Sequence, residues 1–315
     1  MNKTFLLSIC IPTYNRCDIL EKSLKIICED KDFDPELIEI VVLDNCSTDN
    51  TNEIVNKFSF VKYYKNISTI PAGINVIKSL EYGNGKYLKL YNDTVIIKSG
   101  TINFIIEKIK KNVSNKNLLF YNNNYQHSNC EIKINDKNSL IETVSFSNTW
   151  ILNFGILRTE LNKIVNKFEF SELLLPQVDI LFKLFNYNNN FVIFFSDFVE
   201  VNHVEKKGGY NLFKVFINNY LFILKLQKLS LKTYEIEKYR LFRYFIYPWL
   251  TKLFIVEKSS YTFETKNGFS IFIKKYFYNI YIYPFLFLFL FRITLNSLKD
   301  KNTISKLLFM LQTIF

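Results

Sequence analysis

The 315-residue chain has little glycine, proline, histidine or cysteine, with 8, 6, 2 and 5 residues of each. So little glycine and proline excludes a collagen-like or low-complexity chain. The cysteines form no CxxC pair, which argues against a structural zinc site. Their odd number in a chain of this length also argues against a secreted disulfide framework. We therefore expect reduced thiols and a cytoplasmic protein.

Apolar runs long enough to cross a membrane are also missing. The first run, Phe5–Ile11, is too short for a transmembrane helix and is not followed by a small-residue cleavage site. A second run, Ile280–Phe291, has 12 residues and ends at Arg292. A helix needs about 20 apolar residues to cross a bilayer. The sequence therefore predicts no transmembrane span.

Aromatic residues and positive charge are abundant, at 17% of the chain and a net charge of +11. Residues 206–315 hold 18 Lys and Arg against 5 Asp and Glu, whereas residues 1–205 hold 22 against 24. A basic, aromatic segment is typical of a protein that meets an anionic partner, either a phospholipid surface or a nucleic acid. Because long apolar runs separate the basic residues, we expect no nucleic acid. A solvated basic face is the simpler alternative.

Apolar runs alternate with helical patterns through the first two thirds of the chain. Strands are expected at 5–11, 38–43, 87–91, 118–121 and 191–195, and helices at 16–28, 54–58, 72–82, 99–112 and 177–187. The continuous apolar runs are typical of strands buried on both faces. This alternation predicts an α/β fold with a mostly parallel sheet and flanking helices.

The pattern changes after Gly208-Gly209. From Tyr210 onwards the chain has the pattern of several long helices rich in aromatic residues and lysine. We predict two domains, 1–207 and 208–315. The second, α-helical domain would serve membrane-surface docking, acceptor binding or oligomerisation. Packing of its aromatic runs in a core or against a second subunit is an alternative of similar weight.

Three polar clusters follow three of the predicted strands. They are Thr13-Tyr14-Asn15-Arg16, Asp44-Asn45-Cys46-Ser47-Thr48-Asp49 and Asn92-Asp93-Thr94. In an open α/β sheet, ligands bind outside the carboxyl ends of the strands. The chain has no GxGxxG after its first strand and no GxxxxGK[ST], which disfavours a Rossmann dinucleotide site and a P-loop. The clusters instead predict a nucleotide site in which acids accept hydrogen bonds or hold Mg²⁺ against phosphates. Taken singly, an acid such as Asp44 could equally be a loop or cap residue.

In this order and spacing, the clusters resemble those of family 2 glycosyltransferases with the GT-A fold. The resemblance is carried by Ser8–Arg16, Asp44–Thr51 and Asn92–Val95, with Gly73 and Asn75 in the helix between them. It is firm over residues 5–100, extends to about residue 205 and is absent beyond. It implies a GT-A-like, Rossmann-type domain that binds a nucleotide-sugar donor at these strand ends.

The same resemblance implies roles for individual residues. The donor-binding set would be Pro12, Thr13, Tyr14, Asn15, Arg16, Asp44, Asn45, Ser47, Asn75, Asn92 and Asp93. Within it Asp44 would contact the base, and Asp93 would stand at the family's DxD motif, which holds the ribose and a divalent metal. This chain has a single acid at that motif, so its dependence on Mg²⁺ or Mn²⁺ is left open.

Inverting sugar transfer needs a general base that deprotonates the acceptor hydroxyl. The family places this base as an acid at the start of a late helix, where this chain has Asp179 in a largely apolar stretch. Glu172 is the reserve candidate, and a structural Asp in the first helical turn is the alternative. His203, near the predicted domain junction, is a candidate for reaching the metal or the diphosphate, or simply a surface histidine.

Together these features imply an inverting glycosyltransferase of bacterial capsule or lipooligosaccharide biosynthesis. It would move a sugar from a nucleotide-sugar donor to a glycan or lipid-linked acceptor, at the inner face of the cytoplasmic membrane. The alternatives are a degenerate GT-A protein that binds nucleotide without catalysis and, less in keeping with the apolar runs, a basic nucleic-acid-binding protein.

Overall fold

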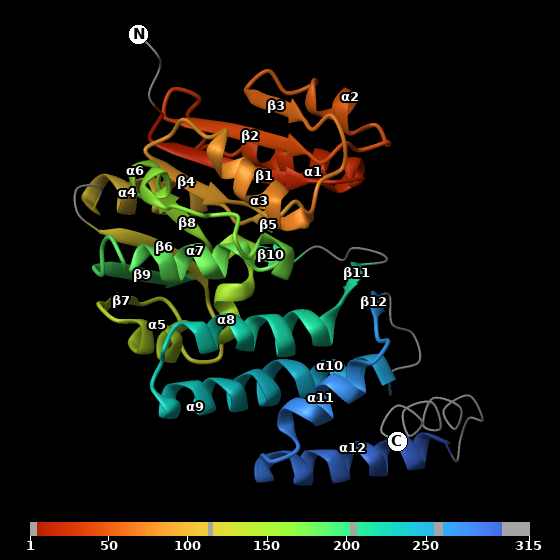
Figure 1. Ribbon diagram of the computed structural model, residues 1–315. Helices are drawn as coiled ribbons and strands as arrows, with labels where there is room; N and C mark the ends of the chain where they lie inside the picture. The colour runs from red at the N-terminus through yellow and green to blue at the C-terminus, as the bar shows by residue number, and fades with distance from the viewer. Residues whose placement is uncertain (1–4, 113–115, 202–206, 255–260, 298–315) are drawn as a thin grey trace. The chain divides into compact units, whose positions relative to one another are not determined.

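The computed structural model describes residues 5–112, 116–201, 207–254 and 261–297 (Figure 1). The chain divides into two compact units, Met1–His203 and Val204–Phe315. They are called unit 1 and unit 2 below, and each is described by itself.

Unit 1 is built on a five-stranded sheet with the strand order β3-β2-β1-β4-β8. The strands are β1 (Leu7–Thr13), β2 (Ile38–Asp44), β3 (Val61–Lys65), β4 (Tyr87–Leu90) and β8 (Gly155–Leu157). The first four strands in this order are parallel, and β8 is antiparallel to β4. The mostly parallel sheet predicted from the apolar runs is therefore confirmed, with β3 and β8 as strands that were not predicted.

Helices cover both faces of this sheet (Figure 1). They include α1 (Cys17–Cys28), the short α2 (Thr51–Val55), α3 (Ala72–Glu81) and α4 (Thr101–Asn112). Side chains alternate between the faces of a strand. On one face Leu7, Ile9 and Ile11 of β1 join the apolar residues of α1 and α4 in one buried cluster. On the other face α3 packs against β1, β2 and β4.

The second half of unit 1 adds smaller sheets and helices. The strands are β6 (Asn117–Asn122), β7 (Glu131–Ile134) and β9 (Phe191–Ser196), which form one sheet, and β5 (Val95–Ile97) and β10 (Val199–Val201), which pair with each other. The helices are α5 (Lys137–Val144), α6 (Arg158–Lys163) and α7 (Pro176–Leu184). Helix α5 falls in a region where no helix was predicted. It begins at Asp136, whose carboxylate accepts hydrogen bonds from the backbone N–H groups of Asn138 and Ser139.

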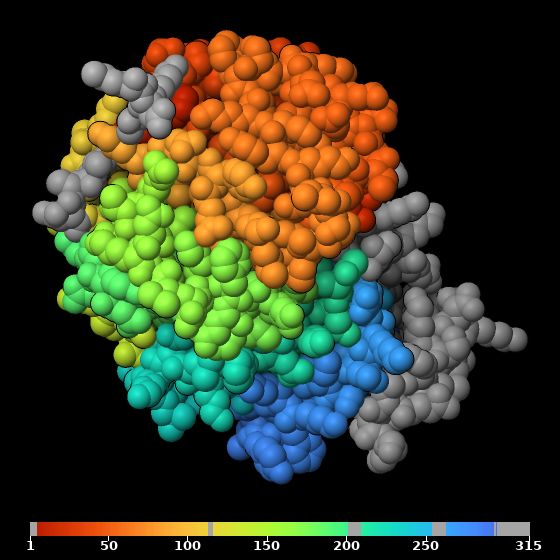
Figure 2. Space-filling view, turned by 45° about the horizontal axis from the view of Figure 1, so that its top comes forward, coloured from red at the N-terminus to blue at the C-terminus, as the bar shows by residue number. Residues whose placement is uncertain are grey.

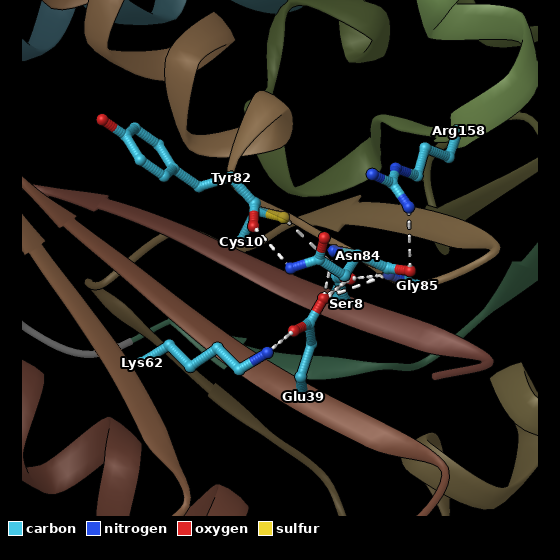
Figure 3. Close-up of polar contacts among 8 residues, drawn as sticks. All are labelled: Ser8, Cys10, Glu39, Lys62, Tyr82, Asn84, Gly85 and Arg158. Atoms are coloured by element: carbon cyan, nitrogen blue, oxygen red, sulfur yellow. Dashed lines mark hydrogen bonds and ion pairs between the residues drawn. The ribbon is translucent and has the colours of Figure 1, made fainter. Parts of the chain in front are cut away.

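A buried carboxylate fixes the turn between α3 and β4 (Figure 3). Glu39 on β2 accepts hydrogen bonds from the Ser8 hydroxyl at 2.5 Å, from the backbone N–H of Gly85 at 3.0 Å and from that of Asn84. Its other oxygen pairs with Lys62 Nζ at 2.7 Å. Gly85 has no room for a side chain, because a Cβ there would lie 2.7 Å from the Ser8 backbone N. The network anchors the start of β4 at the edge of the sheet opposite the carboxyl ends.

Lys89 on β4 is buried without a carboxylate partner among the described residues. Its ammonium donates to the carbonyls of Leu152 and Phe154 and borders a cavity of about 40 Å³ lined almost entirely by apolar side chains. Burial lowers the pKa of Lys89 from 10.5 to about 7. The folded protein therefore holds this amine partly neutral near neutral pH.

This burial predicts a pH-dependent stability. Between pH 7 and pH 9 the unfolded chain keeps a proton on Lys89 that the folded chain loses, so the free energy of unfolding rises with pH. The rise attributable to this lysine is about 2 kcal/mol. Urea unfolding of the wild type and of Lys89→Met at both pH values should show it. An equal rise in the two proteins would contradict the prediction.

Unit 2 is mainly helical, as the sequence predicted. Its elements are β11 (Lys207–Asn211), α8 (Leu221–Leu226), α9 (Leu231–Leu241), α10 (Tyr247–Phe254), β12 (Tyr261–Glu264), α11 (Gly268–Tyr276) and α12 (Tyr283–Ser297), with π-helical segments at Lys214–Tyr220 and Phe242–Ile246. Its core is aromatic, with the Phe242 ring 5.7 Å from that of Phe272 and 5.6 Å from that of Tyr276. The parallel pair β11-β12 was not predicted. None of the described helices of the chain is long and apolar enough to cross a membrane.

Candidate functional site

The carboxyl ends of β1, β2 and β4 bring the first and third polar clusters into contact. Thr13 and Asp44 are register partners at the ends of β1 and β2. The Thr13 hydroxyl donates a hydrogen bond of 3.1 Å to Asp93 Oδ2, which lies 80 positions further along the chain. Parallel strands end at the same edge of a sheet, so side chains that are distant in sequence meet there.

Asp93 is held from two sides. Its Oδ1 forms an ion pair with Arg16 Nη1 at 2.8 Å, and its Oδ2 accepts the bond from Thr13. The Asp93 side chain is 2% exposed and that of Arg16 is 40% exposed. The Ser23 hydroxyl of α1 donates to the carbonyls of Asp93 and Val95, which fixes the backbone around the carboxylate. The pair therefore places one carboxylate inside the protein and a cation at the rim of the site.

Asp44 is fully buried, and each of its oxygens already has a partner. Oδ1 accepts from the Ser47 backbone N–H at 2.8 Å, and Oδ2 accepts from the Tyr63 hydroxyl at 2.6 Å. Burial and this bond to Asp44 raise the pKa of Tyr63 well above its usual value, so the phenol keeps its proton. A base N–H that binds Asp44 would therefore share the carboxylate with Tyr63 or displace its hydroxyl.

The loops after β1 and β2 are tied directly to each other. The backbone N–H of Asn15 donates to Ser47 Oγ, and that of Thr48 donates to Asn15 Oδ1, both at 2.8 Å. Asn15 and Cys46 adopt left-handed backbone conformations, with φ of 49° and 66°. Such conformations are unfavourable for most residues and cluster at functional loops. The two loops therefore form one braced rim.

A chain of amide side chains connects this rim to α3. Asn66 Nδ2 donates to Asn45 Oδ1 at 3.0 Å and to Asn75 Oδ1 at 2.8 Å, and Asn45 Nδ2 donates to the Ile70 carbonyl at 2.8 Å. Asn75, on α3, reaches the Leu43 carbonyl at 3.3 Å. Asn45 and Asn75 thus brace the second loop, and both are buried.

The remaining predicted donor residues differ in exposure. Pro12 and Asn92 are half-buried, and Asn92 Oδ1 accepts from the Thr94 backbone N–H and hydroxyl. Tyr14 is 45% exposed, so its ring is available at the surface beside Asn15 and Arg16. Tyr14, Asn15 and Arg16 are therefore the exposed members of the predicted donor set, whereas the acids Asp44 and Asp93 are buried.

The candidate general base, Asp179, lies in the first turn of α7 and is 2% exposed. Burial raises the pKa of Asp179, and Lys183, one turn further on at 2.8 Å, offsets part of that effect. Lys183 also pairs with Glu169 at 3.0 Å. Glu172, the reserve candidate, is exposed in the turn Ser171–Leu173. Of the two candidate bases, only Asp179 is desolvated, and desolvation is what raises the pKa of a carboxylate toward the range of a general base.

The segment that leads into α7 lies against the start of α3. A Cβ added at Gly73 would come within 1.9 Å of the Ser171 carbonyl oxygen, so this approach requires glycine. Helix α3 thus touches α7 and its preceding turn, and it also carries Asn75 of the amide chain. Two residues before Asp179, Gln177 donates to the Thr149 carbonyl at 2.6 Å, and its buried amide oxygen has no hydrogen-bond partner among the residues that the structure describes.

The described residues offer a metal ion few ligands. No three acidic, histidine or cysteine side chains lie together among them. Asp93 is the one carboxylate at the position of the predicted metal, and it is already paired with Arg16. Mg²⁺ commonly binds through one or two carboxylates together with substrate phosphates, so Asp93 suffices only for a metal that arrives with a diphosphate. His203, the other predicted ligand, lies outside the described residues.

Tyr63, Lys65 and Asn66 lie on or next to β3 and were not predicted as residues of the site. Lys65 Nζ donates to the Ser47 carbonyl at 2.8 Å, so all three brace the second loop. The signal was present in the run Val61–Lys65, where β-prone residues stand between lysines as is typical of an edge strand.

Comparisons with known proteins agree with this geometry. Residues 8–139 match the family described as Glycosyl transferase family 2. The abequosyltransferase RfbV of Salmonella typhimurium is 36% identical over 91 residues, which are 27% of each chain. The GalNAc(5)-diNAcBac-PP-undecaprenol beta-1,3-glucosyltransferase of Campylobacter jejuni is 31% identical over 108 residues, which are 32% of this chain and 34% of that one. The match thus spans about a third or less of each of these relatives.

Solved structures resemble the chain over more of its length. TarS residues 1–349 of S. aureus, also solved with UDP and with UDP-GlcNAc, superpose with a TM-score of 0.57 at 16% identity, over 86% of this chain and 81% of that one. The mannosyltransferase PcManGT of Pyrobaculum calidifontis, in complex with GDP-Man and Mn²⁺, gives a TM-score of 0.52 at 11% identity, over 94% and 86%. The chain therefore has the GT-A fold. Its residues 8–139 are a glycosyl transferase family 2 domain.

Proposed function

We propose that this protein is an inverting glycosyltransferase that uses a nucleotide-sugar donor. The observation that carries the proposal is the network at the carboxyl ends of β1, β2 and β4, where Thr13 and Arg16 hold Asp93 and where Asp44 is buried beside them. The position of this network at the strand ends is the usual ligand site of an open α/β sheet.

The residues of the network suit the parts of a nucleoside diphosphate. The exposed Tyr14 ring can stack on a base, and a base N–H can donate to Asp44. The Arg16 guanidinium matches the geometry of phosphate oxygens and stabilises the charge that develops on the leaving diphosphate. Asp93 orients Arg16 through the 2.8 Å ion pair. The assignment of these donor residues follows the resemblance to the family.

In the reaction we propose, Asp179 removes the proton from the acceptor hydroxyl. That oxygen forms a bond to the anomeric carbon as the bond from this carbon to the diphosphate oxygen breaks. The bonding electrons leave with the nucleoside diphosphate, and the sugar is transferred with inversion. The raised pKa of Asp179 brings this carboxylate closer to the pKa range that suits a general base.

In this proposal a divalent metal would bind only together with the donor diphosphate. Mg²⁺ or Mn²⁺ would enter with the donor diphosphate and take Asp93 as its protein carboxylate. When bound, it would neutralise the charge on the leaving phosphates. The complex of the similar fold PcManGT with GDP-Man and Mn²⁺ supports this mode of binding. His203 is the further ligand proposed on the resemblance alone.

We place the reaction in the synthesis of a bacterial surface glycan, such as a capsule or lipooligosaccharide, with a glycan or lipid-linked acceptor. The printed names of the two curated relatives support this, since one transfers abequose and the other acts on a sugar chain linked to PP-undecaprenol. A lipid-linked acceptor would place the protein at the cytoplasmic face of a membrane.

The donor site can be tested through Asp44. We expect Asp44→Ala to weaken the binding of nucleoside diphosphates by about tenfold, because a base N–H loses its charged acceptor. Isothermal titration with UDP, GDP, dTDP and CDP would measure the affinity. Asp136→Asn changes the acid at the start of α5, an element that carries none of the predicted donor residues, and should leave the affinity unchanged. Unaltered affinity in Asp44→Ala would remove this assignment.

A donor panel separates this function from nucleotide binding without catalysis. The single acid at Asp93 is the feature that favours the degenerate alternative. Wild-type protein that binds a nucleotide sugar but neither transfers nor hydrolyses the sugar, with any acceptor supplied, would favour that alternative.

A further inference from the structure

Helix α12 exposes a continuous apolar face within unit 2. The α12 outer face comprises Tyr283, Phe287, Leu288, Leu290 and Phe291, whose exposed fractions are 45%, 70%, 46%, 41% and 53%. Tyr283, Phe287 and Phe291 follow each other at intervals of four residues, so they lie along one side of the helix. The Phe287 and Phe291 rings are stacked at 6.4 Å.

The opposite side of α12 packs against the aromatic core of unit 2. Phe289 is 1% exposed, and the Phe285 ring lies 5.4 Å from that of Phe242. Figure 1 shows α12 along one edge of unit 2, with α10 and α11 on the same side of it, and Figure 2 shows the surface of this part of the chain in dark blue. The helix is thus anchored by one side and presents large aromatic rings on the other.

A second apolar element precedes the helix. The segment Phe277–Ile280, called the tip below, includes Phe277, Tyr278 and Ile280, with exposed fractions of 51%, 91% and 84%. Fully solvated tyrosine and isoleucine side chains next to an exposed helix face form a larger apolar surface than scattered single residues do.

The sequence around these elements carries a net positive charge. Between Thr265 and Lys299 the sequence contains four lysines and one arginine and no acidic residue. Lys274 is exposed just before the tip, and Arg292 is exposed on α12. Lys275, next to Lys274, is half-buried, and burial together with Lys238 and Lys225 lowers its pKa. Glu235 is the acid that contacts the tip, where it accepts a hydrogen bond from Asn279.

We infer that the tip and the α12 outer face dock onto an anionic phospholipid surface. An interfacial helix buries its apolar face at the boundary between headgroups and acyl chains, while flanking lysine and arginine reach the headgroup phosphates. A second copy of the chain fits this surface less well. Two-fold pairing places the same patch on both subunits, which gathers the exposed cations Lys274 and Arg292 of both copies in one interface.

This inference deepens the proposed location at a membrane, and it does not depend on the transfer reaction. Its test is therefore a physical measurement of binding to vesicles, in which donor and acceptor are absent. A transferase that stays off vesicles and a membrane-bound protein that lacks activity are then distinguishable outcomes.

The experiment is co-sedimentation of the full chain with vesicles of phosphatidylglycerol and phosphatidylcholine, and with phosphatidylcholine alone. We expect binding to the anionic vesicles at low salt and release at 1 M salt, where the Debye length is about 3 Å. Lys274→Gln with Arg292→Gln should weaken binding about 30-fold, since each cation near an anionic leaflet contributes about 1 kcal/mol. Phe287→Ser with Phe291→Ser should weaken it about tenfold or more.

Phe60→Ser is the matched control, because Phe60 lies in unit 1 and is 53% exposed, as Phe291 is. This variant should bind vesicles as the wild type does. A further readout is Phe287→Trp, whose fluorescence should be quenched by lipids with brominated acyl chains, whereas that of Phe60→Trp should not. Wild-type protein that stays in the supernatant at low salt would overturn the inference. The inference would also be overturned if the protein did not bind vesicles and instead formed a concentration-dependent dimer that Phe287→Ser abolishes.

Discussion

Replacing Asp179 by asparagine is expected to lower turnover by about 10²-fold or more, with folding and donor affinity preserved. The amide has nearly the same shape as the carboxylate, but it cannot accept the proton of an acceptor hydroxyl. Steady-state kinetics with a nucleotide-sugar donor, alongside donor titration, would separate the two effects. A loss confined to kcat is the signature of a missing base.

The pH profile provides an independent check on this assignment. Burial raises the pKa of Asp179, so the base is deprotonated only above a pH higher than that of an ordinary aspartate. Activity should therefore fall as pH drops through this raised pKa. Lys183→Met removes the cation that partly offsets the shift, and the acidic limb of the profile should then move to higher pH. Glu172→Gln is the control, and its inactivity beside an active Asp179→Asn would transfer the role to Glu172.

Asp93→Asn is expected to lower kcat/KM by about 10²-fold, the scale of losing one preorganised electrostatic group in an active site. The substitution keeps the size of the side chain but removes the negative charge that holds Arg16 at 2.8 Å. If a metal enters with the donor, this variant should also lose any stimulation by Mn²⁺ that the wild type shows. Kinetics across a Mn²⁺ titration would measure both effects.

The control for Asp93→Asn is a variant in which another aspartate of unit 1 is replaced by asparagine. Asp136→Asn removes the carboxylate at the start of α5, and we expect it to alter stability without altering turnover. Wild-type kcat/KM in Asp93→Asn would show that this carboxylate takes no part in donor binding or catalysis.

The framework of the fold could be predicted from the sequence, because strands that are buried on both faces have continuous apolar sequences. The runs that contain Ile9, Val41 and Leu88 all fall in the parallel sheet. Strand β3 was missed because it lies at the sheet edge, where lysines flank its tyrosines and no apolar run forms. Helix α5 was missed because its eight residues are too few for the period of a helix to be distinct.

The site could be predicted only in part. That Asp44 at the end of β2 and Asp93 after β4 lie at one edge of the sheet follows from the rule that parallel strands end together. The partners of those acids do not, since Tyr63 meets Asp44 only through the pairing of β2 with β3. The burial of Lys89 also has no sequence signature, because a lysine in a strand is ordinarily read as exposed.

The aromatic residues of unit 2 show the same limit. Composition could not show whether these aromatic residues pack in a core or lie on the surface. In the structure some of them are buried and others are exposed. Phe242, Phe272 and Tyr276 are buried in the core, whereas Phe287 and Phe291 are exposed on α12. Sequence periodicity could not separate the two groups, because the first nine residues of α12, Tyr283–Phe291, are all apolar or aromatic.

Hydrogen–deuterium exchange in the presence of a nucleotide sugar tests the central claim most directly. With a donor that the protein binds, the backbone of Thr13–Arg16, Asp44–Ser47 and Asn92–Asp93 should become protected together, since these segments form one network at the strand ends. Helix α5, away from that edge, should exchange as before. Protection elsewhere in the chain with these three segments unchanged would contradict the assignment of the donor site.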